Sequence, residues 1–258
     1  MQRIVACAAL AAALLGCVSA ASMQQSLGYP ETLRGGVVED YHGTRIADPY
    51  RWMEDLDAPA VADWVAAQNA LTTPYLAALP LQAHFRERLT ALWNYPRTGI
   101  PQLEGGRLFY SRNSGLQPQA PVYMRATPDA GPELVLDPNA ISADGSVSLA
   151  QYAPSPDAKL LAYALARGGA DWRTIRVRDI ASGRDLADEV RWMRFSGIAW
   201  TRDGRGFFYS RYPEPPANKV LEAALSGHAL YYHRIGTPQA EDVLVYERPD
   251  LAGWVVGG

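Results

Sequence analysis

Cysteine is almost missing from this sequence: only Cys7 and Cys17 occur among 258 residues, and both lie near the N-terminus. The rest of the chain therefore cannot form an internal disulfide or a cysteine-ligated metal site. Long runs of one charge are missing as well, and the net charge is −3. This balance excludes the strongly basic surface that nucleic-acid-binding proteins present to phosphates, so we expect no nucleic-acid partner.

Catalytic signatures are missing too. No serine has a glycine two residues before it, so the sequence has no Gly-x-Ser-x-Gly nucleophile elbow. No His-Glu-x-x-His pattern occurs, so zinc-dependent hydrolysis has no support. We expect each of the four histidines to be hydrogen-bonded or exposed, namely His42, His84, His228 and His233. The sequence therefore assigns no catalytic residue, no metal and no cofactor to this chain.

Aromatic residues, glycine and proline are plentiful, with 14 Tyr, 7 Trp, 22 Gly and 19 Pro. The stretch 195–213, FSGIAWTRDGRGFFYSRYP, places two apolar runs on either side of Asp203-Gly204. Such a pattern predicts two strands joined by a tight turn. Similar units contain Tyr110 and Tyr163, which gives a repeat of roughly 50 residues. Repeats of this length with several short strands are typical of β-propeller blades.

We therefore predict a mainly β fold, a partial β-propeller of about three blades over residues 96–258. The expected strands are 107–112, 121–126 and 133–136 in blade one, 147–153, 160–166, 173–180 and a short edge near 185–190 in blade two, and 196–201, 206–211, 229–235 and 242–247 in blade three. Each blade should form a separate antiparallel sheet. Three blades leave two apolar faces open, so the sequence is typical of the front part of a longer protein.

Residues 21–95 are predicted to form an α-helical segment ahead of the propeller. Asp57 as the N-cap and Pro59 in the first turn favour the start of a helix. Pro74 is expected to stop or kink this helix. A second helix is expected over Leu81–Trp93. Two helices of this length do not bury a core alone, so we expect them to pack on another surface.

The first twenty residues are predicted to be a secretory signal, because Arg3 precedes an apolar run over Ile4–Leu15. Two processing routes stay open. Val18-Ser19-Ala20 favours cleavage before Ala21, whereas Leu14-Leu15-Gly16-Cys17 resembles a bacterial lipobox, in which Cys17 is lipidated and becomes the new N-terminus. An uncleaved N-terminal anchor is the third alternative. We expect an exported protein, either periplasmic or attached to a membrane through a lipid on Cys17.

Several phrases resemble the N-terminal part of prolyl oligopeptidases, and the resemblance covers the chain from about Tyr29 to its last residue. In chain order they are Tyr41-His42-Gly43, Asp48-Pro49-Tyr50-Arg51-Trp52, Leu136-Asp137-Pro138-Asn139, Asp171-Trp172, the stretch 195–213, and Leu230–Gly236. The resemblance implies a serine peptidase in which a seven-bladed propeller restricts access to a central cavity. It also implies that residues 21–95 pack on an α/β-hydrolase domain that this chain does not contain.

What the resemblance implies for function is cleavage of short peptides after proline, with the Ser-Asp-His triad well beyond residue 258. The 258-residue chain alone should then be inactive. In the Arg194-Phe195-Ser196 motif, Phe195 would face the substrate as an aromatic wall against its prolyl side, the alternative being ordinary packing between blades. Two other functions stay open. One is a non-catalytic propeller-type binding or scaffold protein, and the other is a related oligopeptidase with basic-residue specificity.

Overall fold

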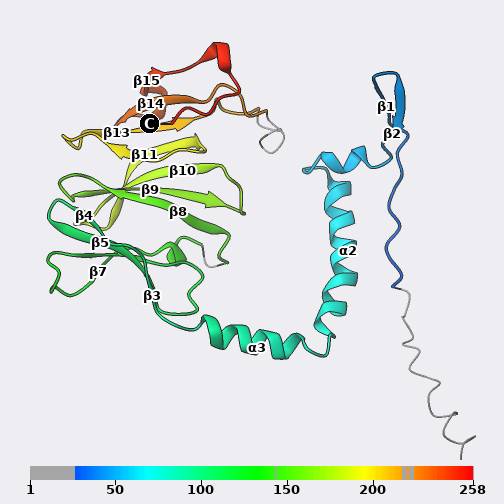
Figure 1. The fold of residues 1–258 in the computed structure, drawn as a ribbon, viewed down its shortest axis with the longest axis horizontal. Helices are drawn as coiled ribbons and strands as arrows, with labels where there is room; N and C mark the ends of the chain where they lie inside the picture. Colours follow the sequence, from blue (N-terminus) through cyan, green and yellow to red (C-terminus); the bar gives the residue numbers. More distant parts are fainter. Residues whose placement is uncertain (1–26, 143, 217–219, 221–223, 258) are drawn as a thin grey trace, which may run out of the picture. The chain divides into compact units, whose positions relative to one another are not determined.

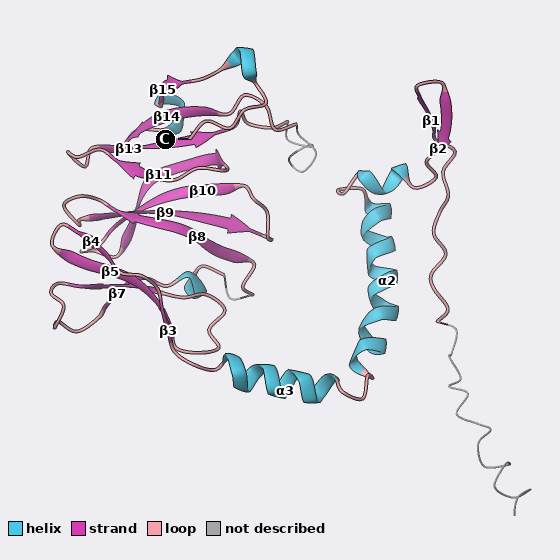
Figure 2. Ribbon diagram, viewed as in Figure 1, coloured by secondary structure: helices cyan, strands magenta, loops and turns pink. Residues whose placement is uncertain are grey.

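The computed structural model describes residues 27–142, 144–216, 220 and 224–257, in two compact units that divide after Pro80 (Figures 1 and 2). The first unit holds the hairpin of β1 (Val38–Tyr41) and β2 (Thr44–Ala47), the short 3-10 helix η1 (Arg51–Glu54) and helix α2 (Pro59–Ala77). The second unit holds helix α3 (Gln82–Trp93), followed by all the remaining strands that the structure describes. The hairpin of β1 and β2, which precedes both α-helices, was not predicted; the remaining strands follow the helices, as expected.

Helix α2 differs from the prediction at both ends. Its N-cap is Ala58, which makes no side-chain capping bond, so the prediction that Asp57 caps the helix is wrong. Pro59 occupies the first turn, as expected, because its fixed φ suits that position. Pro74 does not stop the helix, which continues to Ala77. The turn after the proline still closes, since the amide of Ala78 donates to the carbonyl of Pro74 at 3.0 Å.

Both helices leave most of their apolar side chains exposed. In α2 only Val61 is buried, and in α3, which the structure describes in full, no residue is buried. Phe85, Leu89 and Leu92 form the predicted apolar face of α3, and each is more than half exposed. These helices therefore contribute little to the core. No helix among the described residues combines the length and the apolar character that crossing a bilayer requires.

Blade one is a five-stranded antiparallel sheet. Its strands are β3 (Arg97–Thr98), β4 (Gln102–Glu104), β5 (Arg107–Asn113), β6 (Val122–Arg125) and β7 (Glu133–Leu136). Both β3 and β4 pair with β5, so together they form one interrupted strand. The prediction missed this strand because Pro96, Gly99 and Pro101 break it into two short pieces that carry little strand signal. The other three strands lie where they were expected.

Blades two and three follow the predicted order but are not separate sheets. Blade two consists of β8 (Val147–Pro154), β9 (Leu160–Arg167), β10 (Arg173–Asp179) and β11 (Arg184–Met193), and blade three of β12 (Ala199–Trp200), β13 (Gly206–Arg211), β14 (Ala229–Arg234) and β15 (Val243–Tyr246). A single residue pair, Met193 with Arg211, joins them into one eight-stranded sheet. The expected short edge near 185–190 is in fact ten residues long. Its extra length carries β11 to β13.

The core lies in two layers, one between blades one and two and the other between blades two and three. Figure 1 shows the three blades in this order. Strand β9 contributes to both layers because successive side chains of a strand point to opposite faces. Leu161, Tyr163 and Leu165 pack toward blade one, whereas Ala162 and Ala164 pack toward blade three. Blade two is therefore buried on both faces. The sheets among the described residues do not close into a ring.

A buried histidine ties blade two to blade three. His233 of β14 has no exposed surface, and its Nδ1 donates to Oδ1 of Asp242 at 2.6 Å. Its Nε2 donates to Oδ1 of Asp188, in β11, at 3.1 Å. Burial lowers the pKa of His233, but the bonds to the two carboxylates outweigh this effect and raise the pKa to about 9. His233 is therefore a cation at neutral pH, held between two carboxylates.

We expect this histidine to make stability depend on pH. Because its pKa rises from 6.5 to about 9 on folding, its charge stabilises the fold fully below pH 6.5, and this contribution is lost as the pH rises through 9. The maximum loss is about 3 kcal/mol. Asp188→Asn, which keeps an oxygen acceptor but removes one charge, should reduce the fall in unfolding free energy between pH 6.5 and 9.

The measurement is urea unfolding at a series of pH values, followed by tryptophan fluorescence. Asp129→Asn, at an exposed position, is the control and should leave the pH dependence unchanged. An Asp188→Asn profile that parallels the wild type over this pH range would contradict the assignment of a charged His233.

Candidate functional site

The strand pairing of blades two and three aligns the ends of five strands at one end of the sheet. Ala166 pairs with Arg173, Arg173 with Met193, Met193 with Arg211, and Arg211 with Ala229. The loops that begin or end at these residues must therefore lie side by side. We call the side chains gathered there the strand-end cluster: Trp172, Trp192, Arg194, Phe195, Tyr212 and His228.

Phe195, the residue predicted to face the substrate, lies exposed in this cluster. Half of its surface is open, at 51% exposure, which differs from the buried aromatic side chains between the blades. Its backbone φ is +51°, and that of Trp192 is +65°, a region that side chains other than glycine rarely adopt. Such strain persists only where the surroundings enforce it, and it concentrates at functional sites. Phe195 is therefore an exposed side chain on a strained backbone.

Arg194 holds Phe195 in place from one side. Its guanidinium carbon lies 4.9 Å from the centre of the Phe195 ring and 5.4 Å from that of Trp172. Its Nη2 donates to Oδ2 of Asp171 at 2.6 Å. One cation thus contacts two aromatic faces while a carboxylate fixes its direction, an arrangement that favours a rigid guanidinium. Asp171 and Trp172 precede β10, so this contact connects the loop between β9 and β10 with the segment that leads from blade two to blade three.

His228 fixes the backbone beneath Arg194. The amide of Val256 donates to its Nδ1 at 2.9 Å, so the ring proton is on Nε2, which donates to the carbonyl of Arg194 at 2.9 Å. Burial, the larger effect, lowers the pKa of His228 against these two bonds, so the ring is neutral near pH 7. The ring also lies 4.5 Å from that of Tyr212. The expectation that His228 is hydrogen-bonded is confirmed.

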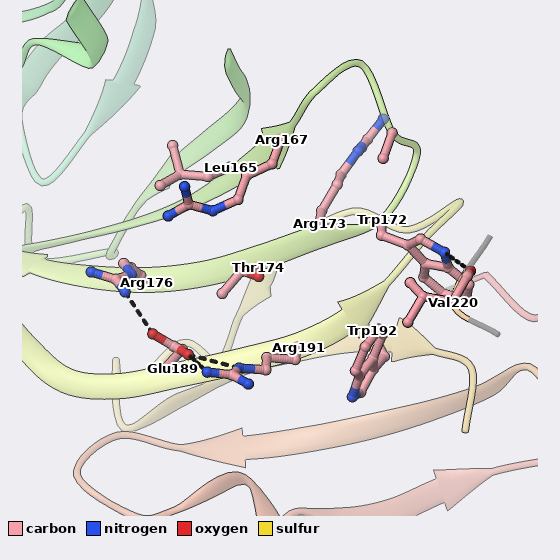
Figure 3. A pocket seen from close by; sticks show the side chains of 11 residues that line it. Leu165, Arg167, Trp172, Arg173, Thr174, Arg176, Glu189, Arg191, Trp192 and Val220 are labelled. Carbon is pink, nitrogen blue, oxygen red and sulfur yellow. Dashed lines mark hydrogen bonds and ion pairs between the residues drawn. The ribbon is translucent and has the colours of Figure 1, made fainter. Parts of the chain in front are cut away.

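Trp172 packs within the strand-end cluster and also lines a pocket. Its ring packs edge-on against Trp192 at 5.7 Å and Tyr212 at 6.0 Å. Trp172 and Trp192 also form part of the wall of a cavity of about 400 Å³ (Figure 3). The remaining walls come from β9, β10 and β11, with several arginine side chains, and from Ala170 and Val220. Two members of the strand-end cluster thus line a pocket as well.

The described residues do not form a complete hydrolytic site. Among them no serine hydroxyl bonds to a histidine, and no group of acidic, histidine and cysteine side chains could hold a metal ion. Cys17 lies outside the described residues. Apart from Phe195, sequence reasoning gave no role to the members of the cluster. The sequence drew attention to Asp171-Trp172 and to the stretch that begins at Arg194-Phe195, because both belong to the phrases that resemble prolyl oligopeptidases.

Comparison with known proteins gives one consistent result. Residues 30–258 match the family described as "Prolyl oligopeptidase, N-terminal beta-propeller domain". The prolyl endopeptidase of Elizabethkingia meningoseptica is 37% identical over 229 residues, which cover 88% of this chain and 32% of that protein. A solved structure from a study of two prolyl endopeptidases is 36% identical, with a TM-score of 0.78 over 85% of this chain and 32% of its own.

A further solved structure is similar over the same region. It is prolyl oligopeptidase B from Galerina marginata, bound to a 35mer hydrolysis and macrocyclization substrate, at 32% identity and a TM-score of 0.74. The match covers 89% of this chain and 35% of that one. The chain thus spans about a third of the length of the relatives that it matches.

The left-handed backbone of Phe195 leads to a stability prediction that does not depend on function. Glycine adopts a φ of +51° without strain, whereas alanine does not. Phe195→Gly should therefore be more stable than Phe195→Ala by about 1 kcal/mol. Urea unfolding midpoints of the two variants measure the difference. Ala199→Gly, in the extended strand β12, is the control and should lose stability. Equal midpoints for the two Phe195 variants would contradict the strained backbone.

Proposed function

This chain belongs to the prolyl oligopeptidase family, as its N-terminal β-propeller domain, and from that premise we propose that it is part of a serine-type endopeptidase that cleaves short peptides after proline. The similarity to prolyl endopeptidases over most of the chain is the observation that carries the proposal. The nucleophile, base and oxyanion donors would be provided by an α/β-hydrolase domain, because peptide hydrolysis needs all three. The propeller would restrict which peptides reach them.

The structure suggests what this chain contributes to such a reaction. Phe195 is exposed, held by Arg194, and carried on backbone that His228 fixes. A flat apolar ring in this position can pack against the proline side of a peptide and exclude water from the reacting bond. A side chain that is already held in place loses less conformational entropy when the peptide binds than a mobile side chain does. Phe195 would therefore orient the substrate, while the chemistry takes place on the hydrolase domain.

A direct assay tests the proposal. The protein that carries both this propeller and its hydrolase domain should hydrolyse a chromogenic prolyl peptide and react with a serine-directed phosphonate. Residues 1–258 expressed alone should do neither, because no serine in them lies on a nucleophile elbow. Phe195→Gly in the complete protein should lower kcat/KM about tenfold, mainly through KM.

Three outcomes of this assay would count against the proposal. Cleavage after Lys or Arg in preference to Pro would favour the basic-residue specificity. No cleavage of any peptide by the complete protein would favour a non-catalytic binding role. Turnover by residues 1–258, with the phosphonate attached to one of their serines, would place the active site within this chain.

We also propose that the protein is exported, on the basis of Arg3 and the apolar run over Ile4–Leu15. Lipidation of Cys17 would attach it to a membrane, whereas cleavage before Ala21 would release it into the periplasm. Cys17→Ser should move the protein from the membrane to the soluble fraction if the lipid route operates. Intact mass shows the difference, since the lipid route leaves residues 17–258 with an attached lipid whereas the other route leaves residues 21–258 unmodified. A mature protein that still begins at Met1 would contradict both routes.

A further inference from the structure

The ring of His228 connects two segments that are far apart in the chain. His228 immediately precedes β14 and is buried. Its Nδ1 accepts from the amide of Val256 at 2.9 Å, and its Nε2 donates to the carbonyl of Arg194 at 2.9 Å. Val256 lies in the segment 252–257, which follows the short 3-10 helix η4 (Pro249–Leu251). One side chain thus joins the segment after blade three to the segment between blades two and three.

The carbonyl that His228 binds belongs to the peptide group between Arg194 and Phe195. Rotation of that peptide group changes the φ of Phe195, which is +51°. On the other side of Phe195, the amide of Ser210 donates to Oγ of Ser196 at 2.7 Å. A left-handed backbone at a side chain as large as phenylalanine persists only where its surroundings enforce it. The bond from His228 is therefore one of two that enforce it, one on each side of Phe195.

Both bonds of His228 require a neutral ring. A neutral imidazole has one nitrogen that donates and one that accepts, whereas a protonated imidazole only donates. A proton on Nδ1 would face the N–H of Val256 across 2.9 Å. A buried charge without a partner is costly, and burial lowers the pKa of His228 accordingly. A ring that is protonated in acid should therefore turn toward water and lose both bonds.

The charged groups around His228 do not compensate for a charge on its ring. The titratable side chains on the elements that contact it, or next to them, are Tyr212, Arg194, Arg211, Glu214, Arg248 and Asp250. Tyr212 packs on the ring at 4.5 Å, and burial raises its pKa, so it stays neutral in acid. Among the described residues, no carboxylate bonds to the ring: Asp250 pairs with Arg248 at 2.7 Å, and Glu214 is exposed. The two nearer arginines are positive and oppose a further positive charge.

These contacts give His228 a role that depends on its protonation. We propose that His228 is a positioning residue, which holds Phe195 in place for the peptide while its ring is neutral and releases it in acid. This inference rests on the proposed peptidase function, and it adds a pH dependence of peptide binding to the same site. Because Phe195 orients the peptide, the effect should fall on KM and not on kcat.

A comparison of the wild type with His228→Gln in the complete protein tests this role. Glutamine can still donate to the carbonyl of Arg194 but cannot take up a proton. The ratio of the wild-type KM to the KM of His228→Gln should rise about fivefold as the pH falls from neutral to about 4.5. Titration of the catalytic base in the hydrolase domain affects both proteins equally, so the ratio reports His228 alone.

Two further variants complete the assay. His228→Ala loses both bonds, so it should raise KM about fivefold at neutral pH with little change in kcat, and the KM of His228→Gln should lie closer to the wild type. The matched control is His84→Gln, at an exposed histidine of α3, which should leave the rise of KM in acid unchanged. A constant ratio of KM over the pH range would overturn the proposal, as would a His228→Ala variant that loses kcat and keeps its KM.

Fluorine NMR keeps this inference separate from the proposed function, since it needs no substrate. Phe195 is replaced by trifluoromethyl-phenylalanine in the complete protein, and the same label at Phe208, a half-buried residue of β13, is the control. The signal from position 195 should shift as the pH falls below 6.5, the ordinary pKa of histidine, while that from position 208 stays constant. In His228→Gln the shift at position 195 should disappear.

The two measurements fail in different ways. If the complete wild-type protein cleaves no prolyl peptide, the peptidase proposal fails by itself, and the fluorine signals still test the role of His228. They also test it if the variants of His228 do not fold, because the wild-type titration needs no change at that position. A signal from position 195 that ignores pH, one that shifts equally with that from position 208, or one that still shifts in His228→Gln would overturn the proposal.

Discussion

Burial of blade two on both faces is the constraint on which the rest of this structure depends. Strand β9 directs Leu161, Tyr163 and Leu165 into one layer and small alanines into the other. A shift of one residue in its register would exchange the large and small side chains between two filled layers, so the register is strongly specified. Large side chains of β9 fill the layer toward blade one, whereas Ala162 and Ala164 belong to the layer toward blade three. The stacking of the blades follows from this alternation.

A fixed register also decides what lies at the ends of the strands. The pairings from Ala166 through to Ala229 align five strand ends, although the residues are up to about sixty positions apart in the chain. The strand-end cluster is a consequence of that alignment. His233, buried between Asp188 and Asp242, maintains the contact between blades two and three from within. A rigid sheet thus supports loops that contain the exposed side chains.

The sequence predicted strands correctly wherever neighbouring residues alone determine the local structure. The strands around Asp203-Gly204 and the apolar runs of blade two were found because alternation and turn residues are local signals. Strands β3 and β4 were missed because prolines and a glycine interrupt them, and Asp57 was taken as a cap although the helix starts after Ala58. Joining of blades two and three depends on one pair, Met193 with Arg211, which no local pattern indicates.

The candidate site shows the same division between local and distant information. Phe195 stood out because it belongs to a phrase that resembles a known family, but its support by Arg194, Trp172 and His228 depends on strands distant in sequence. Asp171, in the loop before β10, could not be matched with Arg194 without the register. Contacts of this kind become visible only in the folded sheet.

The central claim is that the strand-end cluster presents Phe195 to a bound peptide, and photo-cross-linking tests it most directly. Phe195 would be replaced by benzoylphenylalanine in the complete protein, which is then irradiated with a labelled prolyl peptide. The account predicts a cross-link that unlabelled peptide competes away, and none from the same group at Arg202, at the opposite end of the strands. No cross-link from position 195, or equal cross-linking from position 202, would contradict it.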